Sequence, residues 1–268
     1  MTFGWQGFTL EHPDDWAPVT LSGSRTEGYA RIASPAKMSF QVRWKVSKRG
    51  VDLDSVLSTY FDRLRRDAKS AKKGFQSDVE EKDGILLYRY ASEHFGRGAI
   101  LQAPSSGRVF FLEAISTKND SLIPTFRKLL DSFLGQNMRE AASVERWALF
   151  GLDVTLPIGL EVEKKLLQSG RTELTLVNKQ ARIEANRWGL AEQLVAKHGL
   201  EPWAKSVLRV PNAVTETSAE GILLTVPGSL LKKPQIGMAR VQSDRNQIAT
   251  VMVSTRHTDW RPSWDWFN

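Results

Sequence analysis

The histidines are the first residues to consider for chemistry, because imidazole is a common metal ligand and a common acid–base group near neutral pH. The chain has four of them, at His12, His94, His198 and His257. They lack the i, i+4 spacing and the nearby partner residues that a metal site uses. Glu93 and His94 are adjacent, but adjacent residues on a strand point to opposite faces, so they do not form an acid–base pair. We interpret all the histidines as surface or capping residues and expect no metal site.

Other catalytic signatures are absent from the sequence. There is no Gly-x-Ser-x-Gly elbow, no phosphate-binding loop and no dinucleotide fingerprint, since the Gly-Arg-Gly triplet at 96–98 lacks a third glycine and a strand-to-helix context. We predict that this triplet is a flexible turn and that Glu80, Glu81 and Asp83 are solvated turn residues. The chain has no cysteine, which excludes disulfides, thiolate metal sites and cysteine nucleophiles. The sequence therefore predicts a protein that is not an enzyme and that uses no cofactor.

The positive charge has one dense region. The formal net charge is +7, and the cations are spread through both halves of the chain. They are most concentrated between Asp52 and Gly74, at Arg63, Arg65, Arg66, Lys69, Lys72 and Lys73. Apolar residues recur there with helical spacing, at Val56, Leu57, Tyr60, Phe61, Leu64, Ala68 and Ala71. This predicts an amphipathic helix over 52–74, capped by Asp52 or Asp54 and ended by Gly74, with its cations on the solvated face. The alternative is that this face binds nucleic acid or another polyanion.

Short sequences recur in the two halves of the chain. Arg43-Trp44 recurs as Arg187-Trp188, and the Gly-Ile-Leu-Leu sequence at 84–87 recurs at 221–224. The second interval is slightly shorter than the first, as a tandem duplication with one deletion would leave it. We therefore predict two related domains, at 1–137 and 146–268, joined by a short polar connector.

Each copy is predicted to be a sheet with helices on both faces. Apolar and polar residues alternate over 38–46, which places Trp44 in the core. The segments 85–88 and 109–112 are apolar on both faces, as in central strands that are covered on two sides. A closing helix is expected over 121–134, ended by Gly135. The predicted fold class is therefore α+β, with two tandem domains that each form an αβα sandwich around an antiparallel sheet.

The second copy differs from the first in two places. Alternation over 181–188 puts Trp188 on the polar side of its strand, whereas Trp44 lies on the apolar side. Either a β-bulge rotates the end of this strand or Trp188 is partly exposed. The tryptophan-rich segment 259–267 stands in place of the closing helix and is much shorter. We expect its tryptophans to fill a groove.

The order of these features resembles the Mog/PsbP-like superfamily. The residues that carry the resemblance in the first copy are Phe8, Pro13, Trp16, Gly84, Phe126, Leu130 and Phe133. The likeness covers nearly the whole first copy and, more weakly, the second. It implies an antiparallel sheet between helices and a binding role without side-chain catalysis, because relatives include a Ran-binding factor, extrinsic photosystem subunits and adaptor chaperones of bacterial type VI secretion.

The duplication leads to our main functional hypothesis, an intracellular protein-binding adaptor or chaperone without catalytic activity. Two related domains in one chain reproduce a pseudo-twofold dimer, either as a monomer or within a homodimer, with a shared groove for one partner. Aromatic and arginine side chains are the usual anchors of interfaces. The candidate partner-binding residues are Trp188, Trp260, Trp264, Trp266, Arg43 and Arg187. Residues 1–10 have no basic region followed by an apolar stretch, and no segment has the length of a membrane span, which favours the cytoplasm.

Overall fold

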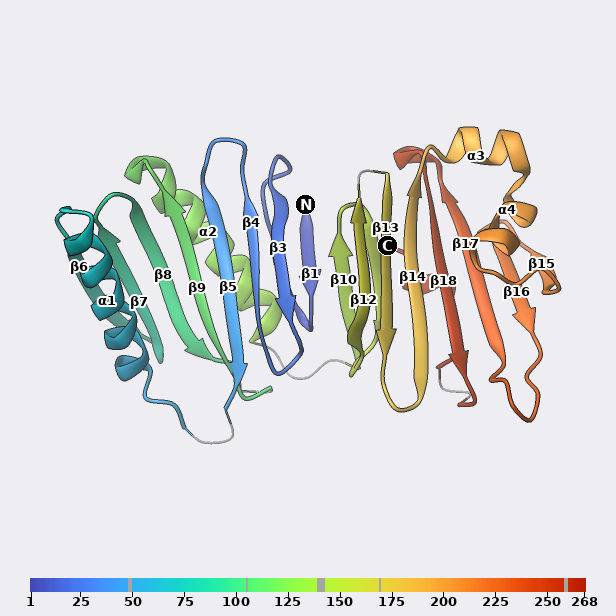
Figure 1. The fold of residues 1–268 in the computed structure, drawn as a ribbon, viewed down its shortest axis with the longest axis horizontal. Helices are drawn as coiled ribbons and strands as arrows, with labels where there is room; N and C mark the ends of the chain where they lie inside the picture. The colour runs from blue at the N-terminus through green and yellow to red at the C-terminus, as the bar shows by residue number, and fades with distance from the viewer. Residues whose placement is uncertain (48–49, 105, 139–142, 169, 258–259) are drawn as a thin grey trace. The chain divides into compact units, whose positions relative to one another are not determined.

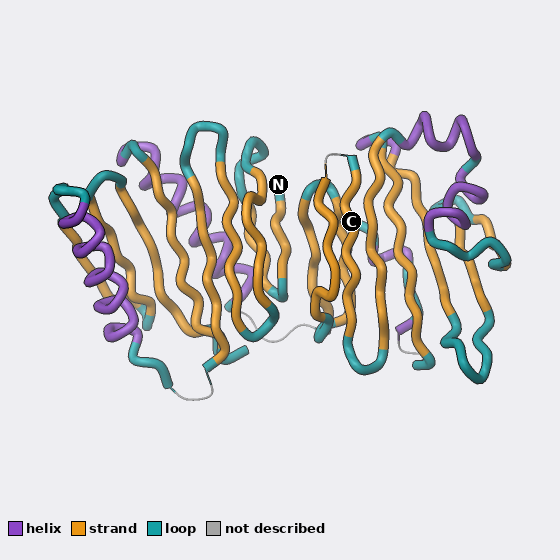
Figure 2. The backbone as a smooth tube through the Cα atoms, viewed as in Figure 1, coloured by secondary structure: helices purple, strands orange, loops and turns teal. Residues whose placement is uncertain are grey.

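The computed structural model describes residues 1–47, 50–104, 106–138, 143–168, 170–257 and 260–268 (Figure 1). Strands dominate it, since 48% of the described residues are in strands and 23% are in helices, as Figure 2 shows along the backbone. The chain divides into two compact units. Unit 1 contains Met1–Phe3 and Phe8–Ala141, and unit 2 contains Gly4–Gly7 and Ala142–Asn268. Residues 4–7 thus belong to unit 2, although the sequence places them in the first domain.

Unit 1 is built on a seven-stranded antiparallel sheet in the order β3-β4-β5-β9-β8-β7-β6. The strands are β3 (Ala17–Gly23), β4 (Glu27–Ala33), β5 (Ser39–Val46), β6 (Gln76–Lys82), β7 (Ile85–Ala91), β8 (Phe95–Gln102) and β9 (Arg108–Ser116). The unit also contains α1 (Leu53–Ser70), α2 (Asn119–Asn137) and the short strand β2 (Phe8–Glu11). Tyr60 of α1 packs edge-on against Phe111, with ring centroids 4.7 Å apart. Phe133 of α2 packs against Phe110 at 5.0 Å. Because adjacent residues of β9 point to opposite faces, α1 and α2 lie on opposite sides of the sheet.

Local interactions fix the two helices of unit 1. The Asp52 side chain accepts a hydrogen bond from the Ser55 amide at 3.1 Å, which confirms Asp52 as the N-cap of α1. The helix ends at Ser70, before the predicted stop at Gly74. Gly135 does not end α2 as predicted, because it lies inside the helix. At the end of α2, Asn137 exchanges two hydrogen bonds with the backbone of Thr9, which fastens β2 to the helix.

Unit 2 has a second seven-stranded antiparallel sheet, in the order β12-β13-β14-β18-β17-β16-β15. Its strands are β12 (Glu161–Gln168), β13 (Arg171–Val177), β14 (Ala181–Gly189), β15 (Val214–Thr217), β16 (Ile222–Val226), β17 (Gln235–Gln242) and β18 (Gln247–Thr255). The helices are α3 (Ala191–His198), α4 (Leu200–Val207), η1 (Ser243–Arg245) and η3 (Trp264–Trp266). When the strands of each unit are counted along the chain, the order is the same in the two sheets. A tandem duplication produces this arrangement.

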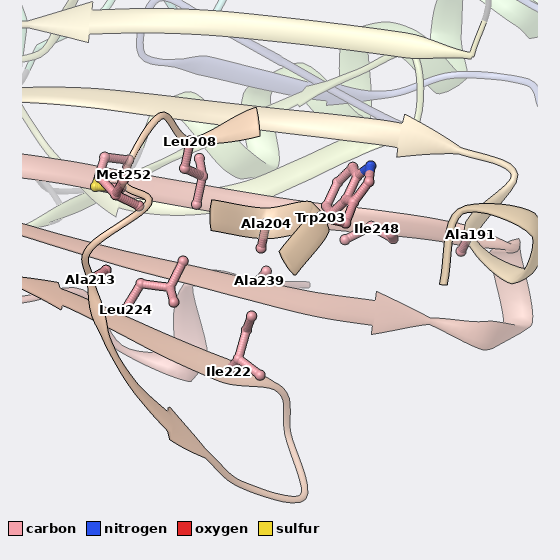
Figure 3. Close-up of a cluster of buried hydrophobic side chains, with 11 residues drawn as sticks. Ala191, Trp203, Ala204, Leu208, Ala213, Ile222, Leu224, Ala239, Ile248 and Met252 are labelled. Carbon is pink, nitrogen blue, oxygen red and sulfur yellow. The ribbon is translucent and has the colours of Figure 1, made fainter. Parts of the chain in front are cut away.

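The core of unit 2 forms where α3 and α4 cover one face of its sheet. Trp203 and Ala204 of α4 lie over Ile248 and Ala239 of the central strands (Figure 3). The opposite face meets the hairpin of β10 (Val144–Leu149) and β11 (Leu152–Pro157), because Gln247 donates a hydrogen bond to the Gly151 carbonyl in the hairpin turn. Gly4 of β1 (Thr2–Trp5) extends this hairpin by pairing with β10.

The αβα sandwich predicted for both copies is wrong, because the fold is dominated by sheets. Strands that are apolar on both faces predict cover on both sides of the sheet, which we interpret as helices. In unit 2, however, the helices α3 and α4 gather on one face, and the β10–β11 hairpin covers part of the other. An apolar face of a sheet must be buried against another element, and that element can be a pair of strands as well as a helix. The strand pattern therefore predicts that a face is buried without predicting what buries it.

The repeated Arg-Trp dipeptide does not occupy equivalent positions in the two sheets. The Trp44 ring is 5.2 Å from Phe8, on the face opposite α1. The Trp188 ring is 5.6 Å from Trp203, on the face that carries α4. β14 pairs with β13 over 182–188 and with β18 over 181–189 without a register shift, so a β-bulge does not rotate the end of this strand. The other alternative holds, since Trp188 is half-buried. A shift of one residue moves a side chain to the other face of a strand, which accounts for the difference.

Candidate functional site

A pocket of about 580 Å³ opens in unit 1 between α1 and the strands β5 and β9. We call it the cationic pocket. Its lining comprises Arg43, Trp44, Lys45, Val46, Ser47, Val51, Val56, Thr59, Tyr60, Arg63, Arg66, Val109 and Phe111. The apolar side of α1 packs on the sheet beside this opening, because Leu57, Tyr60 and Phe61 are buried there. The same helix therefore forms one wall of the pocket and anchors that wall to the core.

Aromatic rings form the floor of the cationic pocket and hold its cations in place. The Arg63 guanidinium lies 5.1 Å from the centroid of the Tyr60 ring. The Arg43 guanidinium lies 5.8 Å from the centroid of Phe111 and 5.6 Å from that of Tyr29. Cations over ring faces are attracted by the ring quadrupole, so these two arginines are kept beside an apolar surface.

The lining carries charge of one sign. Arg43, Lys45, Arg63 and Arg66 contribute four cations, and none of the residues given above for the lining is acidic. Lys45 forms an ion pair with Glu27 at 3.1 Å, and both of these side chains are well exposed, so the pair is weak. A concave, mostly apolar surface lined by cations attracts anions and raises their local concentration. The pocket is therefore suited to a ligand that is both apolar and negatively charged.

A buried carboxylate lies beneath the pocket floor. Glu113 of β9 has no exposed surface. Its Oε1 accepts hydrogen bonds from the Tyr60 hydroxyl at 2.7 Å and the Tyr88 hydroxyl at 3.0 Å, and its Oε2 accepts one from the Gln41 amide. Burial raises the pKa of Glu113 above its ordinary value of 4.5, and the hydrogen bonds from Tyr60, Tyr88 and Gln41 oppose that rise. Burial likewise raises the pKa values of Tyr60 and Tyr88. Glu113 accepts from three donors and is not among the lining residues given above, so its role is to hold the Tyr60 side chain in position beside the pocket.

Two glycines of β8 make room for the tyrosines of this cluster. A Cβ atom on Gly98 would lie 2.0 Å from Cζ of Tyr88, and one on Gly96 would lie 2.1 Å from Cε1 of Tyr90. Gly98 and Gly96 are the cross-strand partners of those tyrosines on β7. The prediction of a flexible turn at 96–98 is therefore wrong, because the triplet lies inside a strand whose missing side chains let the rings cross the backbone.

The structure places only one of the six predicted partner-binding residues in this pocket. Arg43 lines it, whereas the other five belong to unit 2. Arg187 donates a hydrogen bond to Gln247 Oε1 at 2.8 Å, and burial lowers its pKa. It points away from Trp188, since adjacent residues of β14 face opposite sides.

The predicted tryptophans take part mainly in internal packing of unit 2. Trp260 and Trp266 are buried, and the Trp260 indole donates to Gln180 Oε1 at 3.0 Å. Trp264 is half-buried, with its ring 6.0 Å from Phe267. The Arg171 guanidinium lies 4.1 Å from the centroid of the Trp188 ring, which also packs against Trp203 and the core cluster around it. These rings contact other residues rather than one another in the part of unit 2 that the structure describes.

Sequence reasoning missed the residues beneath the pocket. Glu113 is the single acidic residue in the apolar run of 109–116, and a lone charge on a central strand indicates a buried polar cluster. Tyr88 and Tyr90 alternate along one strand as Gly96 and Gly98 do along the next. The lone acidic residue and the matched alternation of tyrosines and glycines were the two sequence patterns that indicated this buried cluster.

The acidic residues Glu80, Glu81 and Asp83 are exposed, as predicted, but only Asp83 lies in a turn. Glu80 and Glu81 lie on the edge strand β6, and Asp83 lies in the turn that follows. Among the residues that the structure describes, no three His, Asp or Glu side chains come together as a metal ligand set. The described helices include none that is long and apolar enough to cross a membrane. No protein-family model and no curated protein matches this chain.

Proposed function

We propose that this protein is a non-catalytic cytoplasmic adaptor, and that unit 1 binds an acidic segment with apolar side chains from a protein partner in the cationic pocket. The observation that carries the proposal is the combination of aromatic lining residues with four cations, and no acidic side chain, among the lining residues that the structure describes. The binding role implied by the resemblance to the Mog/PsbP-like superfamily agrees with this proposal.

The two halves of such a segment would meet two different surfaces. Apolar side chains of the partner would lie on Phe111, Val109 and Val56, and each Å² of apolar surface removed from water contributes about 25 cal/mol. Carboxylates would face Arg43, Arg63 and Arg66, where charge complementarity accelerates association and selects against basic segments. Neither the apolar side chains nor the carboxylates alone would contact both surfaces. A segment that carries both kinds of side chain is therefore favoured over a purely acidic or a purely apolar one.

Three labelled peptides test the proposal by fluorescence anisotropy. The first has a Leu-Phe-Leu core flanked by glutamates, the second has the same core flanked by lysines, and the third keeps the glutamates around a Ser-Ser-Ser core. We expect the first peptide alone to bind. The double substitution Arg63→Glu/Arg66→Glu should weaken its binding by about tenfold or more, which corresponds to about 1.4 kcal/mol.

The same helix supplies the matched control. Arg65 and Lys69 lie on α1 outside the pocket, so Arg65→Glu/Lys69→Glu makes the same charge change and should leave the dissociation constant within about twofold. Equal weakening by the two double variants, or equal binding of the Ser-Ser-Ser peptide, would overturn the proposal.

The alternative of nucleic-acid binding is separated by the same variants. All six cations of the 52–74 segment are exposed, which keeps this alternative open to measurement. Polyanion binding through the whole helix face predicts that heparin retention falls steeply with salt and falls equally in both double variants. Binding in the cationic pocket predicts that only the Arg63/Arg66 pair matters.

A further inference from the structure

The connection between β16 and β17 in unit 2 displays two leucines to solvent. Its sequence over 227–234 is Pro-Gly-Ser-Leu-Leu-Lys-Lys-Pro. Leu230 is 95% exposed and Leu231 is 94% exposed, the highest fractions among the large apolar side chains that the structure describes. Exposed single leucines are ordinary, but two adjacent leucines in the middle of a connection form a continuous apolar tip. We call residues 229–233 the leucine tip.

The backbone of the leucine tip is held by hydrogen bonds. The Ser229 amide donates to the Lys232 carbonyl at 2.9 Å, and the Lys232 amide donates to Ser229 Oγ at 3.1 Å. The Arg256 guanidinium donates to the Leu230 carbonyl at 2.9 Å. The leucines therefore occupy the two central positions of a turn that is closed at both ends. This geometry presents their side chains outward and gives them no place in the core of unit 2.

Positive charge surrounds the exposed leucines. Lys232 and Lys233 follow them directly, and the segment 227–234 contains no acidic residue. Arg256 is hydrogen-bonded to the tip, and it also lines a pocket of unit 2 together with Arg261 and Trp260. A short apolar surface edged by cations is the composition of an element that lies at the boundary of an anionic bilayer.

We propose that the leucine tip inserts into the interfacial region of an anionic lipid bilayer and anchors unit 2 there reversibly. The leucines would enter the boundary between headgroups and acyl chains, and the two lysines would stay among the phosphates, as cationic side chains beside an apolar anchor do. A lipid surface is favoured over a protein partner because the apolar contact is limited to two side chains on a narrow turn. A stable protein interface needs roughly 1,200 Å² or more of buried surface.

Vesicle co-sedimentation of the full chain tests this proposal. The probes are phosphatidylcholine vesicles and phosphatidylcholine vesicles that contain about 30% phosphatidylserine. We expect the chain to partition onto the anionic vesicles. Leu230→Ser/Leu231→Ser should lower the partition coefficient on the order of tenfold or more, and Lys232→Gln/Lys233→Gln should lower it to a similar extent. Val214→Ser is the matched control, because Val214 is a 64% exposed apolar residue on β15 of the same unit, and it should change nothing.

Each alternative result decides against the proposal. Absence of wild-type binding to anionic vesicles would overturn it, and so would unchanged partitioning of the leucine variant, which would show a purely electrostatic contact. Loss of a protein partner from the leucine variant, with vesicle binding intact, would assign the tip to protein recognition instead. The thermal midpoint of each variant should equal that of the wild type, since the substituted side chains are exposed.

Discussion

Gly98→Ala is the sharpest test of how unit 1 positions the residues beneath the cationic pocket. The new Cβ would lie 2.0 Å from Cζ, 2.2 Å from the hydroxyl oxygen and 2.4 Å from Cε1 of Tyr88. Ordinary contacts between such atoms are longer by more than 1 Å. The ring is rigid, so Tyr88 must leave its place and give up the 3.0 Å hydrogen bond to Glu113.

The expected loss of stability combines two costs. A hydrogen bond to a charged group contributes about 1.5–3 kcal/mol, and overpacking in a core costs about 1–3 kcal/mol. We therefore expect Gly98→Ala to lower the free energy of unfolding of unit 1 by about 2.5–6 kcal/mol. Tyr88→Phe removes the hydroxyl without the clash and should lower it by about 1.5–3 kcal/mol.

Urea unfolding of the full chain, fitted with a separate transition for each unit, measures these losses. Gly135→Ala is the control, because Gly135 lies inside α2 with no heavy atom within 4 Å of the added Cβ. It should stabilise unit 1 by about 0.5–1 kcal/mol. The double variant Gly98→Ala/Tyr88→Ala should cost less than the sum of its single substitutions, since the clash disappears with the ring. A loss below about 1 kcal/mol for Gly98→Ala would refute the reasoning.

Three further predictions concern single interactions. Burial raises the pKa of Glu113 in the folded state, so the folded protein binds more protons than the unfolded protein between about pH 4.5 and the raised pKa. The free energy of unfolding of the wild type, relative to that of Glu113→Gln, should therefore fall as the pH rises through this range. A difference between the two urea midpoints that does not change with pH would contradict this prediction. Trp260→Phe removes the hydrogen bond from the indole N–H to Gln180 and should lower the free energy of unfolding of unit 2 by about 1 kcal/mol, measured by urea unfolding. An unchanged free energy of unfolding would show that this hydrogen bond makes no net contribution. Asp52→Ala removes the cap that accepts from Ser55 and should cost about 1 kcal/mol in unit 1; Asp54→Ala is its control, and equal losses would argue against capping by Asp52.

Features that depend on neighbours in the sequence could be predicted. The spacing of apolar residues identified α1, and the type and position of Asp52 identified its cap. Alternation over 38–46 placed Trp44 in the core, where it is 2% exposed. In each case the residues that define the pattern also make the contacts, or lie next to those that do.

Features that depend on pairing between distant strands could not be predicted in this way. Gly96 and Gly98 suggested a turn, because a glycine pair is flexible when taken alone. Their role follows from the register that sets them opposite Tyr90 and Tyr88. The side of the sheet that α4 covers decides what Trp188 contacts, and no local pattern encodes that choice. The cationic pocket likewise joins residues of β5, α1 and β9 that are far apart in the sequence.

Filling the cationic pocket tests the central claim of partner binding most directly. Val56 lines the pocket from α1 and is 38% exposed, so Val56→Trp places a large ring in the binding space while every lining cation is retained. Val79→Trp, on the exposed edge strand β6, is the matched control. We predict that the dissociation constant for the glutamate-flanked Leu-Phe-Leu peptide rises by about tenfold or more in Val56→Trp and stays at the wild-type value in Val79→Trp. An unchanged dissociation constant in Val56→Trp would show that the peptide binds elsewhere.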